Sequence, residues 1–169
     1  LYGFEVEEIS SKDIDHVEIS STKIRMALQT GDIKTATAYL GHPYTLSGKV
    51  VAGKKLGRTI GYPTANIFVE DKYKLIPADG VYAVKVKHQG SIFGGMLNIG
   101  NNPTVNGKDK TIEVNIFDFD KDIYGEEATI YFLERLRDEV KFNNLEELKK
   151  QLAKDKENAL QITGKYQTA

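Results

Sequence analysis

The chain has 169 residues, of which 40% are hydrophobic and 28% charged, which suits one domain with a short appendage. Its 23 Lys and Arg residues against 24 Asp and Glu give a net charge of -1, so we expect no nucleic-acid or lipid-surface partner. The chain has no cysteine and no apolar run near the ~20 residues of a membrane helix, which excludes disulfides, thiolate metal sites and membrane-spanning helices and favours a cytoplasmic protein.

Residues 1–42 are predicted to form a short leader that contains two helices. Ser20 or Ser21 can cap the first helix, and Gly31 can end it. Asp32 can cap the second helix, which stops before Pro43 because a proline disfavours helix in the residue that precedes it. We therefore place a domain boundary between residues 42 and 43.

Residues 44–136 contain six short runs rich in Val, Ile, Tyr and Phe, which predict β-strands. The predicted strands span residues 45–51, 65–69, 81–87, 92–99, 111–119 and 128–136. Gln89 and Gly90 favour a tight turn between the third and fourth strands. Because no helix separates the strands, the pattern indicates a mainly β fold, a closed antiparallel six-stranded barrel of Greek-key type. An open sandwich is the alternative.

The tail that starts at Leu145 is predicted to form a helix, which Asn144 can cap. Leu145, Leu148, Leu152 and Leu160 are expected to share one face of it. We expect this face to pack on the barrel.

A glycine-rich stretch between the first two predicted strands is a candidate phosphate-binding loop. It begins like a P-loop, but Lys55 stands where that motif requires Ser or Thr, so we reject that interpretation. The residues that remain candidates are Gly53, Lys54, Gly57, Arg58 and Gly61. They describe a flexible cationic loop whose backbone can approach an anion, or else a solvated hairpin end.

Thr64 and Asn66 follow this stretch directly, after Pro63. Two residues apart on an extended chain, their side-chain oxygens point to the same side and can reach one hard cation such as Mg²⁺. Mg²⁺ usually keeps several waters and also binds substrate phosphates, so the pair makes most sense beside a nucleotide. Without a nucleotide, the two residues are ordinary polar residues at the start of a strand.

Glu113 lies in a strand whose residues alternate between apolar and polar. Ile112, Val114 and Ile116 share one face, whereas Glu113 and Asn115 share the other. A carboxylate held on a rigid strand can accept a proton from a substrate hydroxyl. The alternative is a solvated side chain on a half-buried strand.

The segment 135–142 and the three histidines are further candidates for a binding or catalytic role. Residues 135–142 mix charges with one aromatic residue, Phe142, and can form either a lid over a planar ligand or a charged connecting loop. The histidines, His16, His42 and His88, show no metal-ligand spacing, so we assign none of them a catalytic role.

Taken in chain order, these segments resemble the riboflavin kinase family. The segments that carry the resemblance are Gly57–Asn66, Asp79–Tyr82, Asn98–Thr104, Glu113–Phe119, Asp122–Gly125 and Arg137–Phe142. The resemblance runs from about residue 44 to residue 160, and its most specific element is the Pro-Thr-Ala-Asn stretch at 63–66. It implies transfer of the γ-phosphoryl group of ATP to riboflavin, which gives FMN and ADP.

The resemblance also implies roles for individual residues. The glycine-rich stretch and Pro63 would cover the ATP phosphates, Thr64 and Asn66 would hold Mg²⁺, and Glu113 would act as base toward the ribityl 5′-hydroxyl. The flavin ring would lie near Arg137, Glu139 and Phe142. Mg²⁺ would arrive with ATP, and no tightly bound cofactor is implied. Members of the family often carry His where this chain has Asn115, which leaves the hydrogen-bond partner of Glu113 open.

The leader adds a second resemblance. Ile19–Arg25 looks like the segment that closes the adenylyltransferase module of bifunctional bacterial FAD synthetases, in which the flavin kinase follows directly. We therefore expect residues 1–42 to be the end of such a module, and we expect this chain not to make FAD by itself. A non-catalytic module that binds flavin or nucleotide is the alternative, and a β-barrel interaction domain ranks last.

Overall fold

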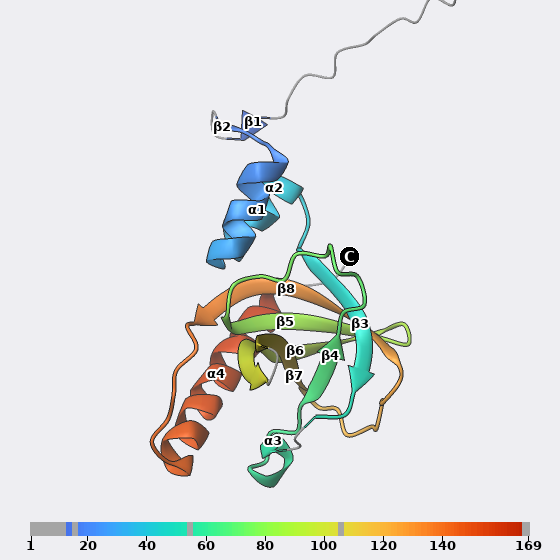
Figure 1. The fold of residues 1–169 in the computed structure, drawn as a ribbon, viewed down its shortest axis with the longest axis vertical. Coiled ribbons are helices and arrows are strands. Elements are labelled where there is room, and N and C mark those ends of the chain that lie inside the picture. Colours follow the sequence, from blue (N-terminus) through green and yellow to red (C-terminus); the bar gives the residue numbers. More distant parts are fainter. Residues whose placement is uncertain (1–12, 15–16, 54–55, 105–106, 167–169) are drawn as a thin grey trace, which may run out of the picture.

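The computed structural model describes residues 13–14, 17–53, 56–104 and 107–166. In chain order its elements are β1 (Asp13–Ile14), β2 (Val17–Glu18), α1 (Ser21–Thr30), α2 (Ile33–Leu40), β3 (Thr45–Val51), α3 (Leu56–Thr59), β4 (Ala65–Phe68), β5 (Gly80–His88), β6 (Ser91–Thr104), β7 (Gly107–Ile116), β8 (Glu127–Arg137) and α4 (Leu145–Lys165). Figure 1 shows a barrel with α4 along one side and the pair α1 and α2 at one end.

Six strands close into a barrel in the order β3-β4-β7-β6-β5-β8, and neighbouring strands are antiparallel. β5, β6 and β7 follow one another as hairpins, and β8 returns by a longer connection to lie beside β5, which is a Greek key. The predicted barrel is confirmed, and the open-sandwich alternative is wrong. The interior is filled by side chains such as Leu46, Val84, Leu97, Val114 and Ile130, each completely or almost completely buried.

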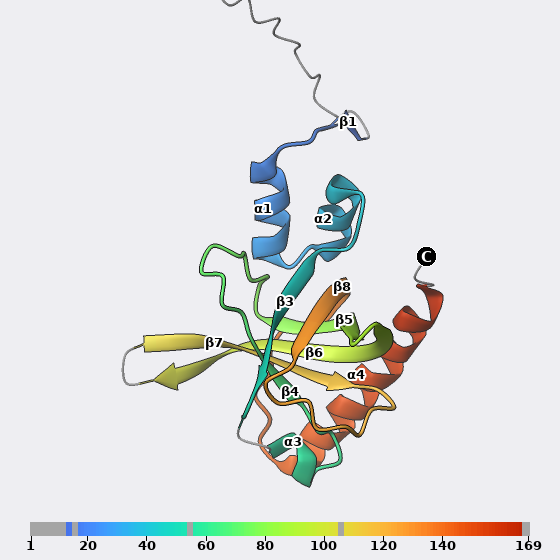
Figure 2. The same cartoon turned by 90° about the vertical axis from the view of Figure 1, so that its right-hand side faces the viewer.

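The predicted strand bounds agree closely with the structure except at the β6–β7 hairpin and at the end of β7, which stops at Ile116 and not at the predicted residue 119. This hairpin continues through the pairs from Gly100↔Thr111 to Thr104↔Gly107, and Figure 2 shows it extending away from the barrel. The prediction ended the strand at Ile99 because Asn-Asn-Pro is typical of turns. The predicted Gln89-Gly90 turn is confirmed, since His88 pairs with Ser91 and both turn residues have positive φ, 45° and 81°.

The helices of the leader pack on the barrel. Ser20 and Asp32 cap α1 and α2 as predicted, and Gly31 ends α1 with a φ of 77°. Leu28 and Ile33 are buried in the same hydrophobic cluster as the barrel interior. This contact holds the end of the leader against the barrel, and the boundary between residues 42 and 43 stays a prediction.

The α4 helix begins after Asn144 as predicted, but its buried face differs from the expected one. Leu145 and Leu160 are 50% and 45% exposed, so the expectation that they pack on the barrel is wrong. The face toward the barrel is formed by Leu148, Leu152, Asp155, Ala159 and Thr163. Leu148 and Leu152 lie on this face as predicted, whereas its other members were missed because they are polar or small. No helix in the described ranges is long and apolar enough to cross a membrane.

Candidate functional site

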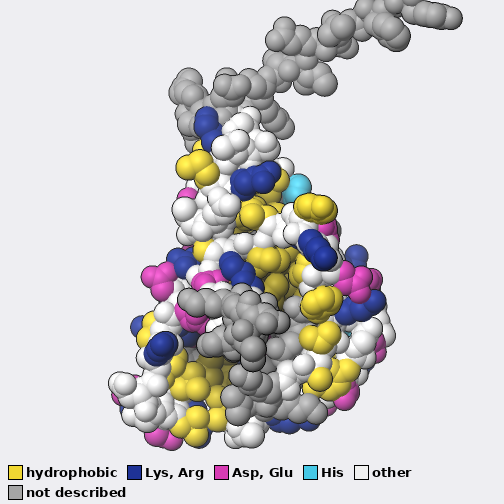
Figure 3. All heavy atoms as spheres, in the orientation of Figure 1, with side chains coloured by type: hydrophobic (Ala, Val, Ile, Leu, Met, Phe, Trp, Pro, Cys, Tyr) yellow, Lys and Arg dark blue, Asp and Glu magenta, His cyan; other side chains and the backbone are white. Residues whose placement is uncertain are grey.

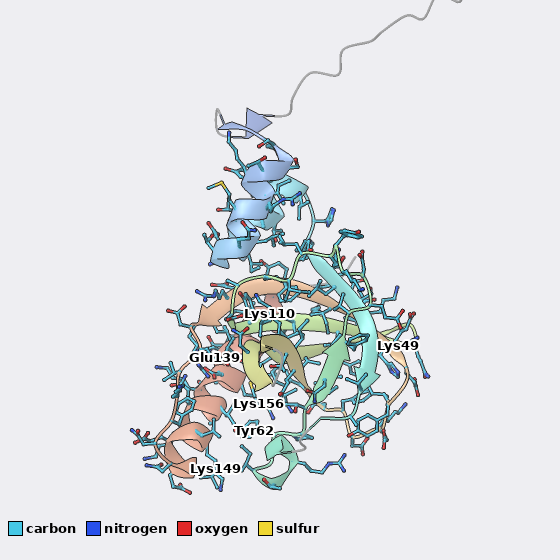
Figure 4. All side chains as sticks on the ribbon, viewed as in Figure 1. Lys49, Tyr62, Lys110, Glu139, Lys149 and Lys156 are labelled. Atoms are coloured by element: carbon cyan, nitrogen blue, oxygen red, sulfur yellow. The ribbon has the colours of Figure 1, made fainter. Side chains whose placement is uncertain are left out.

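A pocket of about 300 Å³ lies between α4, the segment that joins β8 to α4, and the barrel wall, and we call it the larger pocket. It brings together predicted residues from four separate segments, namely Gly57, Thr64, Glu113, Arg137, Glu139 and Phe142. Figure 4 labels Tyr62 and Glu139, which line it from opposite sides. Apolar side chains gather beside α4 on the same face of the molecule (Figure 3). The pocket is therefore mostly apolar with a few polar groups, as small-molecule sites usually are.

Glu113 lies where β4 meets β7. The pairs Ala65↔Val114 and Asn66↔Glu113 fix the register, and Thr64 Oγ1 lies 3.4 Å from Glu113 Oε2. Residues directly opposite each other in antiparallel strands present their side chains on the same face, so Asn66 and Glu113 share one face. Alternation places Thr64 on that face too. Three oxygen-bearing side chains thus lie together on a rigid part of the barrel.

The oxygens of Thr64, Asn66 and Glu113 fit a hard cation whose other ligands are waters and the phosphates of a bound substrate. Thr64 offers a hydroxyl, Asn66 an amide oxygen and Glu113 a carboxylate, and such oxygens are the ligands that Mg²⁺ prefers. In the described part of the chain, no group of three or more His, Cys, Asp or Glu side chains could hold a metal alone. The arrangement therefore suits an ion that brings waters and phosphate oxygens with it.

Residues 56–62 of the glycine-rich stretch form a hydrogen-bonded turn of helix rather than an open loop. The stretch contains the short helix α3, which the sequence did not predict, and Tyr62 donates its backbone N–H to the Gly57 carbonyl at 2.8 Å. A Cβ on Gly57 would lie 2.1 Å from the Tyr62 carbonyl oxygen, and a Cβ on Gly53 would lie 2.0 Å from Asn66 Nδ2. Gly61 has a φ of 86°, which favours glycine. Lys54 lies outside the described residues.

A second, smaller pocket of about 60 Å³ adjoins the first at Thr64, which lines both. Arg58 and Pro63 line it from the glycine-rich side, and Lys121 and Tyr124 line it from the loop that joins β7 to β8. The smaller pocket therefore combines two cations and one carboxylate, that of Asp122, with two aromatic rings, beside the Thr64–Glu113 pair.

The wall of the larger pocket beside α4 contains an ion pair that the sequence did not reveal. Arg137 Nε lies 3.0 Å from both carboxylate oxygens of Asp155, and Arg137 Nη2 lies 2.7 Å from Oδ2. Asp155 is only 1% exposed, and Gln151 also donates to it at 2.8 Å. The Arg137 guanidinium lies 5.8 Å from the centre of the Phe142 ring. A lone Asp inside the buried stripe of α4 was the signal available in the sequence.

Glu139 and Asn115 complete the polar part of the larger pocket. Glu139 Oε1 accepts a long hydrogen bond from Asn98 Nδ2 at 3.5 Å and lies over Gly100, where a Cβ would come within 2.2 Å of it. Asn115 donates to the Pro63 carbonyl at 2.6 Å and is 6% exposed. Asn115 therefore ties the start of β4 to β7, while Glu113 pairs with Thr64.

Two pockets that meet at Thr64, with the Glu113 carboxylate beside it in the larger one, define a closed barrel with a small-molecule-binding site on its wall. Residues 40–163 match the family model described as Flavokinase: Riboflavin kinase, and the chain belongs to the riboflavin kinase family.

Similar proteins agree with this membership. The chain is 46% identical over 159 residues to a bifunctional riboflavin kinase/FMN adenylyltransferase of Haemophilus influenzae, a match that covers 94% of this chain and 51% of the relative. A solved structure described as a macrolide-efflux protein from Streptococcus pneumoniae superposes with a TM-score of 0.85 at 44% identity, covering 89% of this chain and 49% of that one.

Riboflavin kinase from Trypanosoma brucei superposes with a TM-score of 0.51 at 26% identity, and the match covers 73% of this chain and 82% of that one. The chain spans about half the length of the curated bifunctional relatives it matches. The expectation that residues 1–42 close an adenylyltransferase module stays a prediction.

Proposed function

We propose that this chain transfers the γ-phosphoryl group of ATP to the 5′-hydroxyl of the ribityl chain of riboflavin, which gives FMN and ADP. The observation that carries the proposal is the position of Glu113, which lines the larger pocket 3.4 Å from Thr64, the residue that the two pockets share. A hydroxyl from one pocket and a phosphoryl group from the other can meet at this point. Membership of the riboflavin kinase family supports the choice of substrates.

Riboflavin is assigned to the larger pocket. Its volume of about 300 Å³ and its apolar walls, which include Met96 and Leu152, suit a flat aromatic ring system. Arg137, Glu139 and Phe142 lie at the edge formed by the segment between β8 and α4, where they can contact the ring. The ribityl chain then runs toward Glu113.

ATP is assigned to the smaller pocket. Arg58 and Lys121 line this pocket and supply positive charge for phosphates. Gly53, Gly57 and Gly61 are not part of its lining, but they belong to the same glycine-rich stretch as Arg58, and we assign their backbone to the approach of the phosphates. We include Lys54 and Pro63 in this nucleotide site. Mg²⁺ bound with ATP would neutralise phosphate charge, and Thr64 and Asn66 would hold it, with no tightly bound cofactor required.

Glu113 acts as the general base. Its carboxylate accepts the proton of the ribityl 5′-hydroxyl while that oxygen bonds to the γ-phosphorus and the bond from phosphorus to the ADP oxygen breaks. The proton then passes from Glu113 to solvent. Positioning and stabilisation of phosphate charge supply most of the acceleration in such transfers, and a general base adds about 10² to 10⁴-fold.

The direct test is a chromatographic assay of the chain with riboflavin, ATP and Mg²⁺, in which FMN and ADP should appear in equal amounts. Saturable binding of riboflavin without any product would favour the alternative, a binding module without catalysis. Absence of both binding and turnover would contradict either assignment of the larger pocket.

Thr64→Val is expected to raise the Mg²⁺ concentration needed for half-maximal turnover by about 10- to 100-fold, because it removes one ligand oxygen and preserves the shape of the side chain. Riboflavin affinity, measured by quenching of flavin fluorescence, should change little. An unchanged Mg²⁺ titration would remove Thr64 from the metal site.

Gly57→Ala is expected to raise KM for ATP and to destabilise the fold by about 1–3 kcal/mol, because the new methyl group overlaps the Tyr62 carbonyl and displaces the glycine-rich stretch. Steady-state kinetics and thermal unfolding measure the two effects. Gly164→Ala, in α4, is the matched control, since its Cβ would meet no atom within 4 Å. Equal effects of both changes would contradict a role for this stretch in nucleotide binding.

A further inference from the structure

The loop between β7 and β8, residues 117–126, forms one wall of the smaller pocket. Phe119, Lys121 and Tyr124 come from this loop and line the pocket. At its far end, Gly125 donates to the Val50 carbonyl at 2.8 Å, and Val50 donates to the Glu126 carbonyl at 2.9 Å. The backbone thus fixes the end of the loop on β3, whereas Phe119 lies near its start.

His88 contacts both parts of this loop without lining either pocket. Its Nε2 lies 2.6 Å from Glu126 Oε2, and its ring meets the Phe119 ring edge to face with centroids 5.8 Å apart. Because a carboxylate only accepts hydrogen bonds, Nε2 carries the proton and donates it. The imidazole is 5% exposed and therefore shielded from water, whereas the Glu126 side chain is 40% exposed.

Two neighbouring contacts, made by Gln89 and Phe93, involve the same two residues of the loop. Gln89 Nε2 also donates to Glu126 Oε2, at 2.7 Å, and Phe93 packs against Phe119 with ring centroids 5.0 Å apart. His88 and Gln89 lie at the end of β5 and in the two-residue turn to β6, while Phe93 lies just beyond that turn. One end of the β5–β6 hairpin therefore contacts the loop at two points, 119 and 126.

We propose that His88 is a positioning residue for the nucleotide site, holding Phe119 and Glu126 so that the loop keeps Lys121 and Tyr124 in the wall of the smaller pocket. The proposal rests on the assignment of ATP to that pocket. The imidazole combines the flat ring that meets Phe119 with the N–H that meets Glu126. Without His88, only a fraction of the molecules hold the loop in the arrangement that binds nucleotide. The apparent affinity for nucleotide then falls in proportion to that fraction.

Two substitutions separate the two contacts of His88. His88→Phe keeps a ring against Phe119 and removes the donor, whereas His88→Gln keeps a donor for Glu126 and removes the ring. Each is expected to raise KM for ATP by about 5- to 10-fold, with kcat and KM for riboflavin changed less than about twofold. Glu126→Ala, which removes the acceptor, should raise KM for ATP in the same way. When this change is combined with His88→Phe, the rise in KM for ATP should be less than the two single effects added together. The reason is that both changes remove the same contact, the one between residues 88 and 126.

Ile33→Ala is the matched control. Ile33 is buried in α2, so its truncation lowers stability without touching the loop, and KM for ATP should stay at the wild-type value. A rise in KM for riboflavin equal to that for ATP, or the same kinetic change in Ile33→Ala, would overturn the positioning role. If the wild type forms no FMN, the proposed function fails separately, and titration with a non-hydrolysable ATP analogue still compares the wild type with His88→Phe. Equal affinities of the two proteins in that titration would overturn the inference.

Discussion

Glu113→Gln is expected to lower kcat for FMN formation by at least about 10²-fold while leaving the binding of riboflavin and ATP nearly unchanged. The amide has the size of the carboxylate and can still meet Thr64, but it cannot accept the proton of the 5′-hydroxyl. Single-turnover assays of FMN formation measure the chemical step, and fluorescence titration measures flavin binding. The loss should appear in kcat and in kcat/KM alike, because the interaction with the base matters only in the transition state.

Glu127→Gln is the matched control for this prediction. Glu127 is an exposed residue at the start of β8, opposite Lys49 in the register of β3 and β8, and it lines neither pocket. Its replacement should leave kcat at the wild-type value. Full activity in Glu113→Gln would remove Glu113 from the mechanism, whatever the control does.

The part of the site built on strands could be predicted from the sequence because strand geometry is local. A period of two places Thr64 and Asn66 on one side of an extended chain, and the same rule separates Glu113 from Val114. Antiparallel pairing of β4 with β7 then brings the two segments together. The barrel was predictable for a similar reason, since six short strands without intervening helices have few ways to cover their edges.

The contacts that could not be predicted join residues far apart in the chain. Arg137 and Asp155 are separated by 18 positions, and His88 and Glu126 by 38, and no periodicity connects either pair. The short helix α3 was not predicted because its glycine, Gly57, was interpreted as part of a loop, and Gly is a poor helix former. Asp155 was missed because the apolar stripe of α4 was judged by its leucines.

Asp155→Ala is expected to lower the free energy of unfolding by about 3–5 kcal/mol, because it leaves the partly buried Arg137 guanidinium without its counter-charge. The guanidinium side chain is only 19% exposed, so water can replace little of what the carboxylate supplied. Denaturant unfolding measures the change, and the midpoint should move with little change in slope. Riboflavin affinity should fall as well, since Arg137 and Phe142 lose the group that orients them.

A double variant, Arg137→Met with Asp155→Leu, separates stability from flavin binding. Replacing both members of a buried ion pair by apolar side chains is often neutral for stability. The double variant should therefore recover most of the free energy of unfolding that Asp155→Ala loses. Riboflavin affinity should stay low, because the guanidinium that faces the larger pocket is gone. Recovery of both stability and affinity would mean that the ion pair only fills space, and that the flavin is held by the apolar walls and Glu139 alone.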